Sequence, residues 1–548
     1  MAADLILHHA VVRTMDAAGT VADALAIEAD RIVAVGSASE LAARFAGPAT
    51  ELLNVGGRMV LPGFIDAHVH FELTALSLAQ SVDCRTVGSI SELIERLRER
   101  AARTAAGQWV VGQGVFFQDT RIVEGRYPDR HDLDKVSTEH PVLVRFSFHV
   151  AVLNSHALAL CRVSRDTPDP QGGEVQRDEA GEPTGMTRDM VHHLGLPPPR
   201  VEEVRTALAT VGRQRLLANG VTTIQEISGS RQGVAALADL VRGGELPLRV
   251  ALSVHVPGTL QFEDALQRRL DQIRFDGTWF VDGGIKLFAD GGTTAHAAAL
   301  HEPYADEPST RGRLAFSAEE FWEILDACDR AGRRVCVHAV GDRAQDTVLD
   351  GFDRLARRRR TELRHRVEHA GNLLATDERL TRYRQLGLIA APNATFIYTF
   401  GDALEAYLGP ERARRPFRFR TLLDMGFTVP GNSDCTGPEP LGLSPLFNIW
   451  CAVTRRTYRD RLLAPEESIS TQQGLELFTW HAAYGLGQER IKGTLEAGKL
   501  ADLVVLAEDP LAVAADHIKD VAVDFTFVGG RLVHHRPDAQ PLMDNPVA

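Results

Sequence analysis

The order of apolar and polar positions divides the chain into two β-rich ends and a mixed middle. Short segments with apolar residues at alternate positions fill residues 4–60 and recur between 501 and 534, and this period of two indicates strands. Gly529-Gly530 is typical of a hairpin turn in the second of these regions. We therefore expect both ends to pair into one small β-sandwich, although two unrelated β units would have the same pattern.

Between residues 61 and 490, short apolar strands alternate with longer segments of helical periodicity. This alternation is typical of a parallel sheet with helices on its outside. It predicts an α/β fold, a (β/α)8 TIM barrel whose first strand runs from Val60 to His68. The other expected strands are 221–227, 248–255, 284–288, 334–338, 364–369, 388–391 and 428–430, and the expected helices are 202–218, 232–242, 318–331, 343–357 and 377–386.

The interval between the first two strands, from His70 to Val221, is much longer than the few tens of residues that a βα unit needs. We therefore expect an insertion over 110–200, in the loop that follows strand one. Because loops at that face of a barrel carry specificity, the insertion is expected to form a lid. The predicted domains are the barrel, 61–490, and the β-sandwich, 1–60 with 491–548.

Composition narrows the classes of function. The chain has 548 residues, 44% hydrophobic and 24% charged, as is ordinary for a soluble globular protein. Its net charge of −13 argues against a binder of nucleic acid or of anionic membranes. No run of 18 apolar residues exists, so we expect no transmembrane helix. The six cysteines include no C-x-x-C and no signal peptide is apparent, so we expect a cytoplasmic protein.

Two histidines close the first predicted strand, in V-L-P-G-F-I-D-A-H-V-H. His68 and His70 are two positions apart, so on a strand they would point to the same face. In an α/β barrel, active sites lie at the C-terminal ends of strands. The pair therefore suits two ligands of one metal ion. Two half-buried structural histidines are an equally good interpretation of this motif alone.

Other predicted strands also end in residues that can bind metal. His338 and His369 are each followed by a glycine within three residues, as at the exit from a strand, and Asp434 follows the last strand. A carboxylate there can bind metal and accept a proton from water, although an isolated Asp more often caps a helix or a turn. His365 has the strand parity of His369 but lies near the opposite end, so we reject it as a ligand.

Lys286 lies in an apolar strand, in G-G-I-K-L-F-A-D-G-G. Burying a lysine is costly unless it is paired or chemically altered. Reaction of its amine with CO₂ would give a carbamate, whose two oxygens could bridge two cations. An ion pair between Lys286 and Asp290 is the structural alternative.

Six motifs occur in order along nearly the whole chain: P-G-F-I-D-A-H-V-H, I-K-L-F-A-D-G, V-H-A-V-G-D-R-A, R-V-E-H-A, G-N-S-D and G-T-L-E-A-G-K-L-A-D-L-V-V-L. With them the sequence resembles the amidohydrolase superfamily, and within it the amidohydrolase-3 branch, which contains N-substituted formamide deformylases. The resemblance implies a barrel with a β-sandwich built from both termini. It also implies one or two divalent metal ions, with zinc the expected metal, and suggests a homodimer.

The resemblance further assigns metal ligands, which are His68, His70, Lys286, His338, His369 and Asp434. In this assignment the first two histidines bind the more buried ion, the other two bind the more exposed ion, and carbamylated Lys286 bridges both ions. Asp434 would be both a ligand and the general base.

These assignments predict hydrolysis of a C–N amide bond in a small molecule, such as an N-substituted amide or formamide. A metal-bound hydroxide would attack the carbonyl carbon, and Asp434 would transfer the proton to the leaving nitrogen. Candidate substrate-binding residues are His149, Arg343 and Asp290, with structural hydrogen bonds or ion pairs as the alternative roles. Where the branch usually has Asp-Gly-His, this chain has Ser147-Phe148-His149, and the aromatic residue could narrow the pocket.

Three other functions fit part of the pattern. Deaminases of this superfamily typically have a catalytic glutamate just after the strand-five histidine, but Ala-Val-Gly-Asp follows His338, which favours amide hydrolysis. A hydrolase of cyclic amides or esters would use the same metal centre, and only a panel of substrates separates it. A metal-free barrel used as a scaffold is the third function, and the presence of all six ligand types argues against it.

Overall fold

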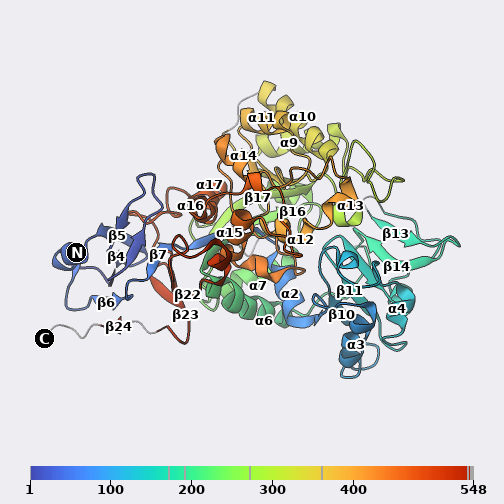
Figure 1. Ribbon diagram of the computed structural model, residues 1–548, viewed down its shortest axis with the longest axis horizontal. Helices are drawn as coiled ribbons and strands as arrows, with labels where there is room; N and C mark the ends of the chain where they lie inside the picture. The colour runs from blue at the N-terminus through green and yellow to red at the C-terminus, as the bar shows by residue number, and fades with distance from the viewer. Residues whose placement is uncertain are drawn as a thin grey trace.

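The computed structural model describes residues 2–170, 173–190, 193–270, 273–358, 362–539 and 542–543. Three regions follow one another along the long axis: the two chain ends, a central sheet covered by helices, and a separate sheet (Figure 1). Within the described residues, no helix is both long enough and apolar enough to span a bilayer. The last part of the predicted C-terminal segment, 544–548, lies outside the described residues.

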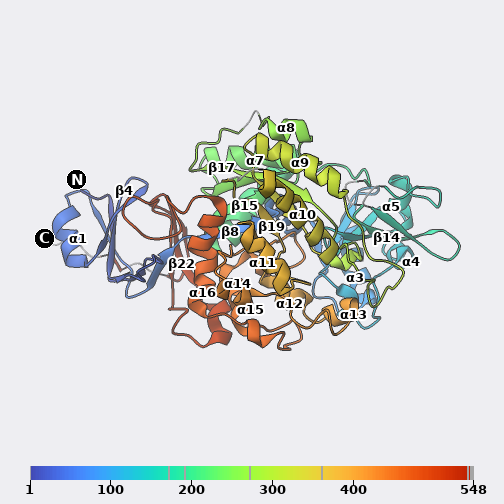
Figure 2. The same cartoon turned by 90° about the horizontal axis from the view of Figure 1, so that it is seen from above.

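The central sheet has seven parallel strands, in the order β20-β19-β18-β17-β16-β15-β8. Helices surround these strands in Figure 2. The strands are β8 (Phe64–Val69), β15 (Val221–Ile227), β16 (Arg249–His255), β17 (Phe280–Phe288), β18 (Val335–His338), β19 (Arg366–Glu368) and β20 (Ile389–Ala391). The helices between them include α6 (Val201–Val211), α7 (Arg231–Arg242), α9 (Ala318–Arg330), α10 (Asp342–Arg358) and α11 (Asp377–Gln385). The prediction of an α/β fold with a parallel sheet is confirmed.

The segment predicted as the last strand, 428–430, is not a strand of the sheet. Pro430 has no N–H, which removes one donor from a regular ladder. The residues that follow nevertheless join both edges of the sheet. The N–H of Ala67 in β8 donates to the carbonyl of Gly431 (3.0 Å), and the side-chain amide of Asn432 donates to the carbonyl of Pro392, directly after β20 (2.9 Å).

The predicted first strand, Val60 to His68, is instead two strands in two different sheets. β7 (Met59–Pro62) pairs with β2 (Val11–Arg13) and β21 (Leu503–Leu506), whereas β8 begins after Gly63 and pairs with β15. A Cβ atom on Gly63 would overlap the side chain of Thr222 in β15, so the chain turns where only glycine fits. The bend links the terminal region directly to the strand that carries His68.

Both chain ends contribute to two further sheets, ordered β24-β6-β1-β4-β5 and β23-β22-β21-β7-β2-β3. Their strands are β1 (Leu5–His8), β2 (Val11–Arg13), β3 (Val21–Ala22), β4 (Ala24–Glu28), β5 (Arg31–Gly36), β6 (Glu51–Asn54), β21 (Leu503–Leu506), β22 (Val523–Val528), β23 (Arg531–His535) and β24 (Leu542–Met543). One hydrophobic core includes Leu7, Leu25, Val505 and Phe527. The two ends are therefore one structural unit, and the alternative of two unrelated β units is wrong.

The insertion forms its own sheet at the opposite end of the molecule, ordered β13-β14-β12-β11-β10-β9. Its strands are β9 (Val82–Asp83), β10 (Val110–Gln113), β11 (Val142–Arg145), β12 (Val150–Leu153), β13 (Glu174–Arg177) and β14 (Pro183–Arg188). The sheet follows α2 (Phe71–Gln80), and α3 (Ile90–Ala101) packs into the same core. This unit therefore starts some thirty residues before the predicted boundary at 110.

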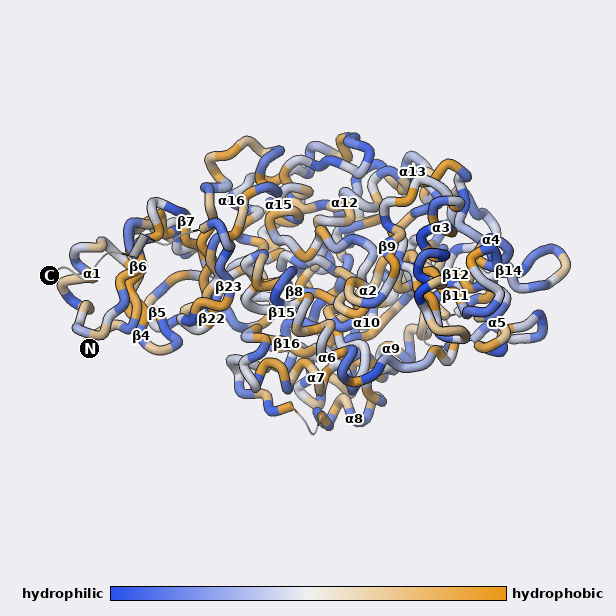
Figure 3. Tube along the Cα trace, turned by 90° about the horizontal axis from the view of Figure 1, so that it is seen from below, coloured by the Kyte–Doolittle hydropathy of each residue, from blue (hydrophilic) through white to orange (hydrophobic). Residues whose placement is uncertain are grey.

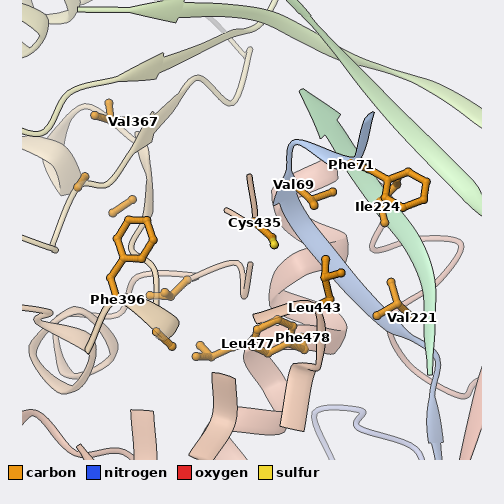
Figure 4. Packing of buried hydrophobic residues seen from close by; sticks show 14 of the residues in the cluster. Val69, Phe71, Val221, Ile224, Val367, Phe396, Cys435, Leu443, Leu477 and Phe478 are labelled. Carbon is orange, nitrogen blue, oxygen red and sulfur yellow. The ribbon is translucent and has the colours of Figure 1, made fainter. Parts of the chain in front are cut away.

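Hydrophobic and hydrophilic residues alternate in short stretches along the chain in all three regions (Figure 3). In the central region, Val69 and Phe71 pack beside Val221 and Ile224 of β15 (Figure 4). Leu477 and Phe478 belong to the same core, and a Cβ atom on Gly431 would lie 2.6 Å from Phe478. This packing holds the end of β8 and the segment after Pro430 against each other.

Candidate metal centre

Two histidines and one carboxylate meet at the C-terminal end of β8. Asp434 Oδ1 lies 3.3 Å from His68 Nε2 and 3.5 Å from His70 Nε2. The three ligand atoms all lie within 4.8 Å of one another. The backbone fixes this arrangement, because the N–H of Asp434 donates to the carbonyl of His68 (2.8 Å). Two imidazoles and a carboxylate are a donor set that suits a divalent metal ion.

The other three predicted ligands surround the same point. His369 Nε2 lies 3.8 Å from Asp434 Oδ2, and Lys286 Nζ lies 3.4 Å from His68 Nε2. The ring of His338 lies 4.6 Å from the ring of His369, centroid to centroid. Lys286 has an exposed fraction of 0%. We call these six residues the metal cluster, and the structure brings all of them together.

Side chains behind the metal cluster orient two of its histidines. Glu368 Oε2 lies 2.8 Å from His68 Nδ1, and Asn393 Oδ1 lies 2.8 Å from His369 Nδ1. Because each Nδ1 is engaged, each Nε2 faces the cluster, as is usual for metal-binding histidines. Neither Glu368 nor Asn393 was predicted from the sequence as a partner of these histidines. The available signal for Glu368 was an acidic residue inside a buried strand, R-V-E-H, where an unpaired charge would be costly.

His369 is not the last residue of a strand, as the pattern over 364–369 predicted, because β19 (Arg366–Glu368) ends one residue before it. The face of β19 that points across the sheet carries Arg366 and Glu368, which contact Ala67 and His68 of β8. His369 follows the strand and has φ 71°, in the left-handed region. The turn, and not strand parity, therefore directs its ring. His365 lies at the other end, where its Nδ1 accepts a hydrogen bond from the N–H of Val335.

Burial sets the charge states in the cluster. It lowers the pKa of His68 to about 4 and also lowers the pKa values of His70, His338 and His369, so the imidazoles are neutral near pH 7. Burial raises the pKa of Asp434, but the neighbouring imidazoles outweigh it and hold the pKa below the ordinary value. Neutral imidazole and ionised carboxylate are the forms that bind metal.

The metal cluster opens into a cavity with an empty volume of about 650 Å³. Its walls are largely aromatic, with Phe116, Phe148, Phe288, Phe396, Phe400 and Phe417 among the lining residues. Phe148, where the resembling branch usually has glycine, stacks on the ring of His70 at 5.9 Å. The insertion therefore supplies part of the wall directly above the cluster.

The three candidate substrate-binding residues differ in where they lie. His149 lines the cavity. Asp290 accepts hydrogen bonds from the backbone of Ala299, Val340 and Gly341 and lies 3.5 Å from His338 Nε2, so it supports the loops and does not neutralise Lys286. Arg343 donates to the carbonyl of Gly312 (3.1 Å) and is not among the residues that line this cavity.

A parallel sheet with imidazole and carboxylate groups gathered at the C-terminal ends of its strands defines a metal-binding α/β protein. More specifically, the sequence model of a protein family, described as "Amidohydrolase family", matches residues 51–534 of this chain. The chain therefore belongs to this family. The resemblance seen in the sequence is thus confirmed.

Individual relatives cover nearly the whole chain. N-substituted formamide deformylase of Arthrobacter pascens is 29% identical over 97% of this chain and 98% of its own. Protein LONG AFTER FAR-RED 3 of Arabidopsis thaliana is 30% identical over 97% of this chain and 92% of its own. A solved structure of an uncharacterized metal-dependent hydrolase from Pyrococcus horikoshii OT3 has a TM-score of 0.73 and 26% identity, covering 94% of this chain and 99% of that one.

Proposed function

We propose that this protein is a metal-dependent hydrolase that cleaves a C–N amide bond in a small molecule, such as an N-substituted amide or formamide. The observation that carries the proposal is the approach of His68, His70 and Asp434 to one point at the base of an apolar cavity. The similarity to N-substituted formamide deformylase supports the choice of bond. An apolar, largely aromatic cavity with a few polar groups at its base suits a small molecule.

The residues of the metal cluster take distinct roles in this proposal. A bound divalent ion acts as a Lewis acid and lowers the pKa of water. His68 and His70 would hold the ion through Nε2, and Glu368 keeps the ring of His68 in place. Asp434 accepts the proton of the attacking water and delivers it to the leaving nitrogen. The aromatic walls exclude bulk water and bind the apolar part of the substrate.

We extend the proposal to a carbamylated Lys286. Burial lowers the pKa of Lys286, which favours the neutral amine that reacts with CO₂. The reaction joins Nζ of the neutral amine to the carbon of CO₂ and releases one proton, so a carboxylate anion replaces an uncharged amine. Together with His338 and His369, the carbamate would hold a second ion. Zinc is the metal that we propose, because it prefers nitrogen and carboxylate ligands.

At the level of the fold, we propose that the segment after Phe427 is the eighth strand of a closed (β/α)8 barrel and that the terminal sheets are a β-sandwich. Backbone bonds from this segment to β8 support closure. The insertion would be the lid. The six cysteines are unpaired, which supports the proposal of a cytoplasmic protein. The homodimer stays a prediction.

The test measures metal content and turnover together. Purified wild-type protein is expected to carry stoichiometric divalent metal by elemental mass spectrometry and to hydrolyse members of a panel of N-substituted formamides, other amides, cyclic amides, esters and aminated heterocycles. Asp434→Asn should lower kcat by about 10²–10⁴-fold, the usual contribution of general acid–base catalysis, while keeping most of the metal.

Asp239→Asn, on the exposed side of α7, is the matched control and should behave as wild type. Two results would overturn the proposal: wild-type protein without stoichiometric metal, or near-wild-type turnover in Asp434→Asn. Turnover confined to esters or to aminated heterocycles would instead favour the alternative substrate classes.

A further inference from the structure

The insertion brings a histidine and an aspartate together at the wall of the metal cavity. His149 Nδ1 lies 2.5 Å from Asp189 Oδ1. His149 lies in the turn between β11 and β12, Asp189 directly follows β14, and the N–H of Asp189 donates to the carbonyl of His149 (2.8 Å). Neighbouring strands thus align the backbone of both residues, and the side chains meet as a consequence.

Two consecutive glycines of the central region leave room for this pair. A Cβ atom on Gly292 would lie 2.5 Å from His149 Cδ2, and one on Gly291 would lie 2.7 Å from Asp189 Oδ2. Gly292 has φ −82°, which alanine adopts readily, so its requirement is for space. Both glycines follow β17, the strand that carries Lys286. The pair is therefore docked onto the loop beside the metal cluster.

The pair directs a polar edge of the imidazole into the cavity. Asp189 engages Nδ1, which leaves Nε2 for the cavity, and the ring lies 6.0 Å from the ring of His338. Beside it, Thr293 also lines the cavity, is 3% exposed, and has no hydrogen-bond partner for Oγ1 among the described residues. A buried hydroxyl without a partner, next to an oriented imidazole, points to a polar group on the ligand.

We propose that His149 is a substrate-binding residue whose Nε2 hydrogen-bonds the reacting amide group, together with the hydroxyl of Thr293. Asp189 is a positioning residue that holds the imidazole in place. The inference rests on the proposed amide hydrolysis and gives the insertion a part in the chemistry beyond covering the cavity.

The first experiment compares His149→Ala and Asp189→Asn with Asp166→Asn, an exposed carboxylate of the same insertion. We expect kcat/KM to fall about 10–100-fold in the first two variants and to stay unchanged in the third, with equal metal content and melting temperature in all. Added imidazole should restore part of the turnover of His149→Ala, which a purely structural role would not allow. Unchanged kcat/KM in His149→Ala overturns the inference.

A second readout does not depend on turnover. An N-substituted methanesulfonamide presents the N–H and oxygen atoms of an amide but is not hydrolysed, and its Kd can be measured by calorimetry. We expect the Kd to rise about tenfold in His149→Ala relative to wild type and to be unaffected in Asp166→Asn. Equal Kd values in wild type and His149→Ala contradict the proposed hydrogen bond.

The glycines provide a test that keeps both side chains of the pair. Gly292→Ala should displace His149 and lower kcat/KM at least tenfold, whereas a Cβ atom on Gly88 of the insertion would meet only Glu92 Oε2, at 3.9 Å, so Gly88→Ala should behave as wild type. Full activity in Gly292→Ala overturns the docking argument. A wild-type protein that hydrolyses no amide overturns the proposed function and this inference together, whereas an active wild type with unchanged variants overturns this inference alone.

Discussion

The two ends of the parallel strands bury charged groups in contrasting ways. At the N-terminal end, Arg249 at the start of β16 donates two hydrogen bonds to Asp502 (2.7 and 2.9 Å), and Lys492 donates to Thr223 Oγ1 (3.1 Å). Arg249 and Asp502 are a balanced ion pair, and both contacts join the central sheet to the terminal region. At the C-terminal end, three imidazoles approach the carboxylate of Asp434, and the amine of Lys286 approaches one of these imidazoles. That convergence is understandable around a cation, which the first arrangement does not need.

A pair of opposite charges also lies behind the metal cluster and supports it. Arg366 and Glu368, both 0% exposed, pair at 2.9 Å and lie directly behind His68. A buried pair of opposite charges can thus join two regions of the fold, as Arg249 and Asp502 do, or orient a residue of the metal cluster, as Arg366 and Glu368 do. Each of the following predictions tests one end of the strands against the other.

The largest expected effect is the removal of metal. Dialysis against a chelator should reduce turnover to background, and divalent metal should restore it. The melting temperature should fall as well, because an ion at 1,000 times its Kd stabilises the fold by about 4 kcal/mol. Elemental mass spectrometry would confirm that all divalent metal is lost. Turnover that survives this loss would show that the groups at the C-terminal end of the strands do not need a cation.

At the opposite end, Asp502→Asn should act on stability alone. It leaves Arg249, 0% exposed, without its charged partner, and such losses typically cost about 3–5 kcal/mol of unfolding free energy. Urea denaturation would measure this, with metal content per folded molecule unchanged. Asp424→Asn, which removes a solvent-exposed pair with Arg420, is the control and should cost less than about 1 kcal/mol. Equal effects of the two substitutions would argue against a structural role for the buried pair.

Asn393→Ala should weaken the metal cluster without dismantling it. The substitution removes the acceptor that engages His369 Nδ1, and loss of such a partner typically lowers metal affinity about 10–100-fold. Competition with a chromophoric chelator would give the affinity. If the metal affinity is unchanged while the unfolding free energy drops, Asn393 has a purely structural role, as Asp502 has at the N-terminal end of the strands.

The smallest expected effect is a pH dependence of stability. Burial lowers the pKa of Lys492 to about 7, against about 10.4 for an unfolded chain. Between these values the unfolded state binds one more proton, so this group makes stability rise with pH, by at most about 1.4 kcal/mol per pH unit. Lys492→Met should remove that slope in urea denaturation at pH 7 and pH 9. Identical slopes of unfolding free energy against pH in the variant and the wild type would show that Lys492 does not cause the pH dependence.

Local sequence patterns predicted the central strands well, because buried strands are apolar and their ends carry turn residues. β15 has the predicted bounds of 221–227, and the six predicted ligands lie together at the strand ends. Periodicity could not reveal that Gly63 divides one apolar run between two sheets, since the cause is the side chain of Thr222, far away in the sequence. Residues 428–430 form no regular strand for a local reason, because Pro430 has no N–H to donate.

The supporting residues were harder to predict because they act through distant contacts. An acidic residue in an apolar strand made Glu368 noticeable, but its partner His68 is recognisable only from the distance between them, as is Asp189 from its distance to His149. Strand parity could not predict the left-handed backbone of His369, which no pattern of apolar residues indicates. Candidate metal ligands can therefore be predicted from residue type and strand position, whereas the residues that orient these ligands can be found only from the tertiary structure.

The pairing of β7 with β21 has a consequence for synthesis of the chain. β7 ends at residue 62 and its partner begins at residue 503, so one edge of β7 stays open while the ribosome adds about 440 residues, which takes roughly 20–90 s at typical elongation rates. During that interval β7, the strand that precedes β8, has an exposed backbone edge that could pair with other nascent chains. Completion of the sheet that contains β7 therefore waits for a segment that is synthesised much later.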